Sequence, residues 1–175
     1  MRRIALIGGS FDPIHNGHLI LAEYAKAELN LDTIIFVPCN KSAYRDKLIQ
    51  AKSIDRLAML MSINKQGKYI ISSCELLRGK TSYTIDTVKF FTNLFKNDNL
   101  VLIAGKDSQI KFSSWKDAEE IPKYVDIKFA TKDFYVPQIG ISSTLIRYLT
   151  KEGKSIKHLV PASVEDYIIK HKLYK

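Results

Sequence analysis

Residues 4–19, IALIGGSFDPIHNGHL, constrain the fold of this chain more than any other stretch. A short apolar run stops at Gly8-Gly9, a Ser-Phe-Asp-Pro turn follows, and His15 and His18 stand where an amphipathic helix would begin. The pattern predicts a buried strand that leads through a tight turn into a helix. Such a junction gathers backbone N–H groups, the positive end of a helix and two imidazoles around one point. That point suits a phosphate group that becomes more negative during a reaction.

Apolar runs alternate with helical patterns along the rest of the chain. This alternation predicts an α/β fold, a Rossmann-like, doubly wound, mostly parallel sheet with helices on both faces. Ligands bind such sheets beyond the carboxyl ends of the strands, where the turn after Ile7 lies. The expected strands cover residues 3–7, 33–37, 69–72, 100–104, 125–130 and, more weakly, 134–139. The expected helices cover residues 17–30, 53–64, 83–95, 115–121, 142–150 and 163–171.

The domain organisation is expected to be simple. The 175 residues contain no internal repeat and no low-complexity tract, which favours a single domain over residues 1–175. Residues 39–52 are polar with few apolar anchors, and we interpret them as a mobile substrate loop rather than a domain boundary.

Charge and composition narrow the function only a little. The net charge is +9, but the 27 lysines and arginines are spread along the chain, which favours a solvated basic surface over a nucleic-acid site. No apolar run approaches a membrane span, and the first one is too short for a signal peptide, so a cytoplasmic location is expected. Cys39 and Cys74 form no C-x-x-C unit; reduced thiols are the default, and their pairing in space stays open.

The first candidate site is the glycine turn with its two histidines. Gly8 and Gly9 permit a tight backbone and the close approach of a ligand. Asn16 is expected to cap the helix, and His15 and His18, three residues apart, can share one helical face. Imidazoles can donate hydrogen bonds to phosphate oxygens, and they add positive charge when protonated.

Three other interpretations of this turn are weaker. A zinc site would need further ligands, and only His158 and His171 remain as histidines, with no cysteine nearby in sequence. A purely structural role is the default interpretation for a single histidine, but two histidines beside a glycine turn make that role less favoured. The G-x-G-x-x-G spacing of a dinucleotide-binding turn is absent. Gly79-Lys80-Thr81 resembles the end of a P-loop, but Cys74 stands where that motif requires glycine.

The second candidate site is the segment ISSTLIR at residues 141–147. Ser142 can cap a helix, and Arg147, about one turn later, can return its guanidinium toward the same anion. Alone, such a segment is more often a well-capped surface helix. Together with the histidine turn, it predicts a polyphosphate held between two helix N-termini.

GGSFDPIHNGH followed by ISSTLIR resembles the nucleotidyltransferases with the His-x-Gly-His motif and, within them, the bacterial nicotinate-nucleotide adenylyltransferases. The similarity continues along almost the full length, in RLAML at 56–60, SYTIDT at 82–87, AGKDS at 104–108, Trp115, and EGKSIKHLVPASVEDYI at 152–168. The resemblance implies transfer of the adenylyl group of ATP to nicotinate mononucleotide, with release of pyrophosphate. It also implies Mg²⁺ that arrives with ATP, since no acidic cluster in the sequence indicates a metal cage.

The resemblance also assigns roles to residues. The catalytic groups would be His15, His18 and Arg147. The residues around ATP would be Gly8, Gly9, Ser10 and Phe11 at the reacting phosphates, Ser142, Ser143 and Thr144 at the outer phosphates, and Gly105 and Asp107 at the ribose. The residues around the mononucleotide would be Tyr83, Thr84 and Trp115 at the nicotinate ring and Arg45 at the phosphate. Taken singly, these residues have simpler interpretations: core packing for Tyr83 and Trp115, and a helix cap for Thr84 or Asp107. Residues 42–45 read Ser-Ala-Tyr-Arg where the family usually has Pro-Pro-His before the basic residue.

Two rival functions stay open at the level of sequence. Phosphopantetheine adenylyltransferases share both phosphate motifs, and a basic nucleotide- or RNA-binding module without catalysis would account for the charge and the aromatic residues. The paired motifs favour ATP as a partner. Within the resemblance, SYTIDT, the Gly-x-Asp to Trp spacing and the C-terminal LVP segment favour nicotinate mononucleotide over phosphopantetheine. Neither nucleic acid nor a membrane is expected as a partner. The sequence does not distinguish nicotinate from nicotinamide mononucleotide, and it does not indicate the oligomeric state.

Overall fold

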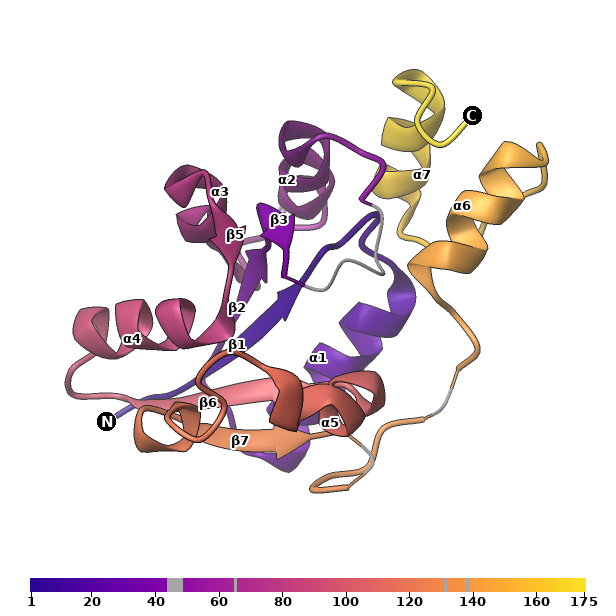
Figure 1. Cartoon of the computed structure of the whole chain (residues 1–175). Coiled ribbons are helices and arrows are strands. Elements are labelled where there is room, and N and C mark those ends of the chain that lie inside the picture. The colour runs from indigo at the N-terminus through magenta and orange to yellow at the C-terminus, as the bar shows by residue number, and fades with distance from the viewer. Residues whose placement is uncertain (44–48, 65, 131, 138) are drawn as a thin grey trace.

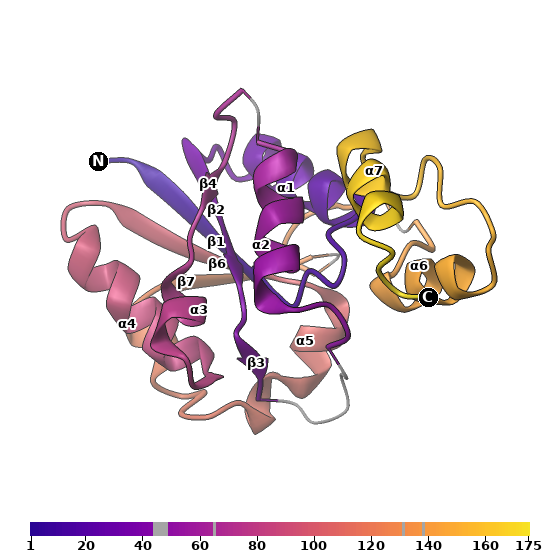
Figure 2. The ribbon, with the colours of Figure 1, turned by 90° about the horizontal axis from the view of Figure 1, so that it is seen from above.

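The structure is a computed structural model of the chain, and it describes residues 1–43, 49–64, 66–130, 132–137 and 139–175. The described residues form a five-stranded parallel sheet in the order β4-β2-β1-β6-β7 (Figure 1; β4 is labelled in Figure 2). Its strands are β1 (Arg3–Gly9), β2 (Thr33–Pro38), β4 (Ile70–Ile71), β6 (Asn99–Ala104) and β7 (Asp126–Phe129). Two short strands, β3 (Lys41–Ser42) and β5 (Thr81–Ser82), form a separate parallel pair.

Helices cover both faces of the sheet, as the alternation predicted (Figure 2). Side chains of β1 point alternately to the two faces: Ala5 and Ile7 join one buried cluster, and Ile4 and Leu6 join the other. The first cluster receives residues from α1 (Asn16–Glu28), α2 (Ser53–Ser62), α6 (Ser143–Lys151) and α7 (Ala162–Lys170). The second receives residues from α4 (Thr84–Leu94) and the 3-10 turn η2 (Ile121–Lys123).

The order of the strands reverses at β1. The chain leaves β1 through α1 and pairs β2 on one side, and it later returns to pair β6 on the other side. Such a switch leaves a crevice beyond the carboxyl end of the central strand, where open α/β sheets bind ligands. Gly8-Gly9 lies at this end, and Figure 1 shows β1 pointing toward α6 and α7.

Several short elements differ from the sequence predictions. The helix predicted over 115–121 is replaced by η1 (Phe112–Ser114), a turn and η2, because Asp117 adopts a left-handed φ of 51° that no helix continues. The strand predicted over 134–139 is reduced to a single bridge between Ala130 and Phe134. Two helices were not predicted, α3 (Cys74–Arg78) and α5 (Lys106–Lys111), since five and six residues are too few to show a helical period.

Two further observations complete the fold. Both Cys39 and Cys74 are free thiols. Among the described residues, no helix has the length and apolar character that crossing a membrane would require.

Candidate active site

Phe11 supports the turn after β1 from the core side. This residue adopts a left-handed φ of 47° and is 1% exposed. Its ring meets His18 and Phe36 edge-on, with centroids 5.1 Å and 5.6 Å away. A Cβ on Gly9 would lie 3.0 Å from this ring, so glycine is required there by close approach. Phe11 therefore faces the core and supports the His18 ring, and its side chain is not available to a ligand.

The two histidines form one stacked pair at the start of α1. Their ring centroids lie 3.6 Å apart, and the rings are 25° from parallel. The His15 backbone N–H donates to His18 Nδ1 at 3.3 Å, which leaves Nε2 to carry the proton of the neutral His18 ring. A Cβ on Gly17 would lie 3.0 Å from the His15 ring, so the glycine of the His-x-Gly-His motif makes room for this stack.

The N-cap of α1 corrects one prediction. His15, with an extended backbone at φ −146° and ψ 168°, is the N-cap, and Asn16 is the first helical residue. The Asn16 side chain instead donates to the His158 carbonyl at 2.7 Å, and its backbone N–H donates to the Leu159 carbonyl at 2.9 Å. Asn16 thus ties the start of α1 to the segment before α7.

Burial sets the protonation of His15. His15 is 7% exposed, and desolvation lowers the pKa of its imidazole to about 4. His15 is therefore neutral at pH 7, and the charge that a protonated imidazole would add does not come from this residue.

The second predicted segment meets the first directly. Ser142 caps α6 as expected, accepting a hydrogen bond from the Leu145 N–H at 3.1 Å. The Ser143 hydroxyl donates to the Pro13 carbonyl at 2.9 Å. A Cβ on Gly17 would lie 3.6 Å from the Ile141 carbonyl, so the N-termini of α1 and α6 are neighbours. The structure brings the two motifs together at one place, which we call the phosphate cradle (residues 8–18 and 141–147).

Arg147 closes this cradle from α6. Its Nη1 donates to the Asp12 carbonyl at 2.8 Å, and its Nη2 donates to the Thr144 hydroxyl at 3.3 Å. Nε is buried without a hydrogen-bond partner among the described residues. The guanidinium is thus fixed across the turn, about one helical turn from the Ser142 cap.

Arg56 is a buried cation that the sequence analysis did not single out. It is 1% exposed on α2, and its guanidinium donates to the Ser10 carbonyl at 2.6 Å and to the Asn40 carbonyl at 3.2 Å. Asn40 N–H donates in turn to the Ser82 hydroxyl at 3.0 Å. A signal for Arg56 was present, because it shares one helical face with the buried Met59 and Leu60.

Asp12 is the other group that was missed. The residue is 1% exposed, and its carboxylate accepts hydrogen bonds from the backbone N–H groups of Gln50 and Ala51 and from the Tyr174 hydroxyl, at 2.7, 3.0 and 2.8 Å. Arg147 Nη1 lies 3.8 Å from the same carboxylate. Nothing local in the sequence marks Asp12, since its partners come from distant segments.

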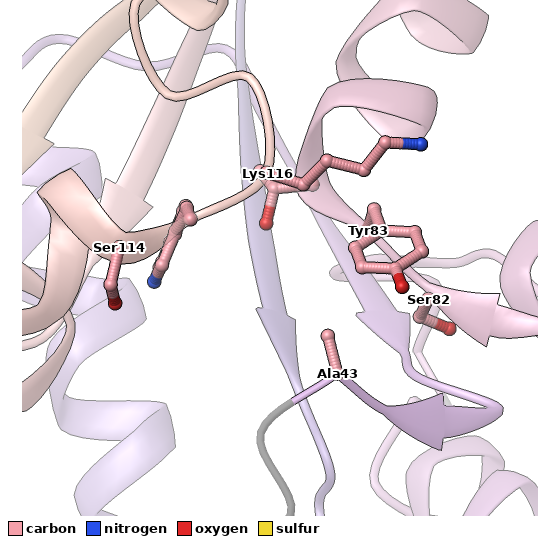
Figure 3. Close-up of a pocket in the computed structure, with 7 residues that line it drawn as sticks. Ala43, Ser82, Tyr83, Ser114 and Lys116 are labelled. Atoms are coloured by element: carbon pink, nitrogen blue, oxygen red, sulfur yellow. The ribbon is translucent and has the colours of Figure 1, made fainter.

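A separate pocket lies beside the start of α4 (Figure 3). Its cavity is about 280 Å³, and its lining includes Tyr83, Thr84 and Trp115, the three residues predicted for the nicotinate ring. Tyr83 is the N-cap of α4 and Thr84 its first residue. Lys116 Nζ lies 4.7 Å from the centre of the Tyr83 ring. We call this cavity, with Ala43, Ser82 and Ser114 completing its lining, the acceptor pocket.

The remaining predicted residues lie at the same edge of the sheet or outside the described part. Gly105 is the N-cap of α5, and Asp107 lies exposed in its first turn. Because Ile103 pairs in register with Ile7, Gly105 follows β6 at the level where β1 ends at Gly8-Gly9. Arg45 falls within residues 44–48, outside the described residues.

Comparison with known proteins fixes the family. Residues 6–149 match the cytidylyltransferase-like family. A protein of Thermus thermophilus named as a probable nicotinate-nucleotide adenylyltransferase is 37% identical over 186 residues, which cover 99% of this chain and 100% of that protein. The chain belongs to the nicotinate-nucleotide adenylyltransferases of the cytidylyltransferase-like family. It is therefore a nucleotidyltransferase.

Solved structures show the fold of this adenylyltransferase in other organisms. A putative nicotinate-nucleotide adenylyltransferase of Vibrio parahaemolyticus superposes with a TM-score of 0.78 at 21% identity, covering 99% of this chain and 96% of that one. The Plasmodium falciparum nicotinic acid mononucleotide adenylyltransferase, solved in complex with NaAD, gives 0.76 at 23% identity, with coverage of 99% and 98%. At these identities the likeness establishes the shared Rossmann-like fold.

The site of this nucleotidyltransferase holds no protein cage for a metal within the described residues. No three His, Cys, Asp or Glu side chains gather there as metal ligands. Asp12, the carboxylate nearest the cradle turn, is already engaged by the donors named above. A divalent ion that accompanies ATP would thus take its ligands from the phosphates and from water.

Proposed function

We propose that this enzyme transfers the adenylyl group of ATP to nicotinate mononucleotide, using the phosphate cradle for the triphosphate and the acceptor pocket for the pyridine ring. The observation that carries the proposal is the joining of two motifs more than a hundred residues apart through the Ser143–Pro13 and Arg147–Asp12 hydrogen bonds. The full-length relationship to the Thermus thermophilus protein supports the same acceptor.

The chemistry requires alignment more than proton transfer. A phosphate oxygen of the mononucleotide, already an anion at neutral pH, forms a bond to the α-phosphorus of ATP. The bond from that phosphorus to the β-phosphate oxygen breaks, and pyrophosphate leaves with the electron pair. Alignment of two such reactants contributes about 7–11 kcal/mol in favourable cases. A general base is not needed, which is consistent with the depressed pKa of His15.

The cradle supplies hydrogen-bond donors where negative charge develops. His18 would donate through Nε2, and the neutral His15 would hold the His18 ring by stacking. The backbone of Gly8-Gly9 and the N-termini of α1 and α6 add N–H groups and dipoles of the right sign. Ser142, Thr144 and Arg147 would hold the outer phosphates from α6, with Ser143 contributing its backbone because its hydroxyl donates to the Pro13 carbonyl. Gly105 and Asp107 would meet the ribose.

Mg²⁺ would enter as MgATP and neutralise part of the triphosphate charge when bound. The described residues fit this role better than that of a resident metal site, because the Asp12 carboxylate already accepts three hydrogen bonds from protein donors. The residues of the chain then act on phosphate oxygens and not on the ion.

The acceptor pocket favours an acid over an amide on the pyridine ring. Tyr83 and Trp115 offer aromatic faces, and the pocket opens at the N-terminus of the eleven-residue helix α4, with Thr84 as its first residue. A carboxylate placed there is stabilised by the helix dipole, whereas a neutral amide gains little. We therefore place nicotinate mononucleotide ahead of nicotinamide mononucleotide.

A panel of acceptors tests this proposal. The enzyme is incubated with MgATP and either nicotinate mononucleotide, nicotinamide mononucleotide or phosphopantetheine, and pyrophosphate release is measured. We expect the highest kcat/KM with nicotinate mononucleotide. Preferential use of phosphopantetheine, or ATP binding without pyrophosphate release with any of the three, would contradict the assignment.

A further inference from the structure

The chain beyond α7 turns back toward the phosphate cradle. After α7, Lys172 adopts a left-handed φ of 52°, and the Leu173 N–H donates to the Ile168 carbonyl at 3.0 Å, which reverses the chain direction. Tyr174 then packs into the same buried cluster as Ile146 of α6. In both ribbon views this end of the chain lies beside α6 and α7 (Figures 1 and 2). A residue 162 positions away in sequence thus reaches Asp12.

The Tyr174 hydroxyl forms its hydrogen bond with the cradle and not with solvent. The residue is 8% exposed, and its hydroxyl donates to Asp12 Oδ1 at 2.8 Å. Burial, with the charge of Asp12 beside it, holds the Tyr174 pKa far above its ordinary value, so the group stays a neutral donor. A residue that only filled the core would not need the hydroxyl.

Asp12 transmits this contact to Arg147. The Asp12 carbonyl accepts from Arg147 Nη1 at 2.8 Å, while the Asp12 carboxylate lies 3.8 Å from the same nitrogen. Tyr174 donates to Asp12 Oδ1, whereas Arg147 Nη1 lies 3.8 Å from the other oxygen, Oδ2. Without the tyrosine hydroxyl, the buried carboxylate would lose one of its three close donors and would be free to turn Oδ2 toward Arg147 Nη1. A guanidinium drawn onto the carboxylate would turn away from the triphosphate.

From this geometry we propose that Tyr174 is a positioning residue for ATP, which holds the Asp12 carboxylate so that the Arg147 guanidinium faces the outer phosphates. The inference rests on the proposed function in one respect, the placing of those phosphates at Arg147. Tyr174 itself touches no substrate and acts through Asp12.

The test is Tyr174→Phe, which keeps the buried ring and removes only the hydroxyl. We expect the Kd and KM for MgATP to rise about tenfold, in the range for a hydrogen bond to a charged group, and the inhibition constant of pyrophosphate to rise with them. The KM for nicotinate mononucleotide should change less than about twofold. Equal rises for both substrates would show general loosening and would overturn the inference, as would an unchanged Kd for MgATP.

A matched control is present in the neighbouring helix. Tyr167 of α7 donates to Asp55 Oδ1 at 3.0 Å, which is also a tyrosine–aspartate hydrogen bond but is made to α2 and not to the cradle. Tyr167→Phe should leave the Kd for MgATP within about twofold of the wild-type value. If it weakens MgATP as much as Tyr174→Phe does, the effect belongs to the packing of α7.

A double-mutant cycle of Tyr174 and Asp12 shows whether Tyr174 affects MgATP affinity through Asp12 or directly. In an Asp12→Asn background, Tyr174→Phe should add less than about a twofold further change to MgATP affinity, because the charge that it controls is gone. Additive losses would contradict the inference. Calorimetric binding of MgATP needs no acceptor, so a wild-type protein that binds MgATP without transfer would refute the proposed function alone.

Discussion

The phosphate cradle and the acceptor pocket are built in different ways. The cradle depends on side chains that are 1–7% exposed, Asp12, His15 and Arg56, and each makes contacts that fix one orientation. The acceptor pocket depends on half-buried rings at the ends of short elements, with Trp115 just after η1 and Tyr83 just before α4. Under the proposed function, this contrast assigns the positioning of the triphosphate to the buried core and the choice of acceptor to half-buried residues that can change at little cost to folding.

Loss of a donor in the cradle should have the largest effect. His18→Ala should lower kcat by about 10²–10³-fold, the range for removing one preorganised donor, with little change in melting temperature because His18 is only partly buried. Steady-state pyrophosphate release and a thermal melt measure the two. A folded His18→Ala enzyme with near-normal turnover would remove the histidine pair from the mechanism.

Gly17→Ala should disturb the cradle without removing any functional group. The new Cβ would meet His15 Nδ1 and Cε1 at 3.0 Å, so the stack must shift by a few tenths of an ångström, and we expect kcat to fall about tenfold. Gly140→Ala is the matched control, because a Cβ there meets nothing within 4 Å and its φ is not left-handed. Similar kinetics for the two variants would show that the stack tolerates displacement.

Truncation in the acceptor pocket should change the use of one substrate only. Trp115→Ala removes a ring beside the cavity and should raise the KM for nicotinate mononucleotide about tenfold, the size of one lost stacking contact, while the Kd for MgATP stays within about twofold. Separate titrations of the two substrates make the comparison. Equal losses for both would mean that the cradle and the pocket are not independent.

The smallest effect concerns pH and stability. The His15 pKa is lowered from 6.5 in the unfolded chain to about 4 in the fold, so the unfolded state binds more protons between these values. The stabilisation that depends on neutral His15 is complete above pH 6.5 and is lost as pH falls toward 4, by about 1 kcal/mol at pH 5.5. Urea unfolding at pH 7.5 and 5.5 measures it, with His15→Gln as the variant that lacks this titration. An identical pH dependence in both proteins would show that His15 is not buried as described.

Much of the fold was predictable, because apolar runs such as 3–7 and 100–104 can only be buried strands and the alternation with helices requires a parallel sheet. The proximity of the histidine turn and the ISSTLIR segment was predicted from their places at strand and helix ends, but the Ser143–Pro13 hydrogen bond that joins them was not. The identity of the N-cap did not follow, because the extended backbone of His15 is imposed by the preceding turn. The roles of Arg56 and Tyr174 depend on partners that are distant in sequence, and no local pattern encodes such contacts.

A crystal structure of the enzyme with a non-hydrolysable ATP analogue and Mg²⁺ tests the central claim most directly. The account predicts triphosphate density in the cradle, with oxygens within hydrogen-bond distance of both His18 and Arg147. Density that contacts only one of the two motifs, or lies elsewhere on the sheet, would contradict it.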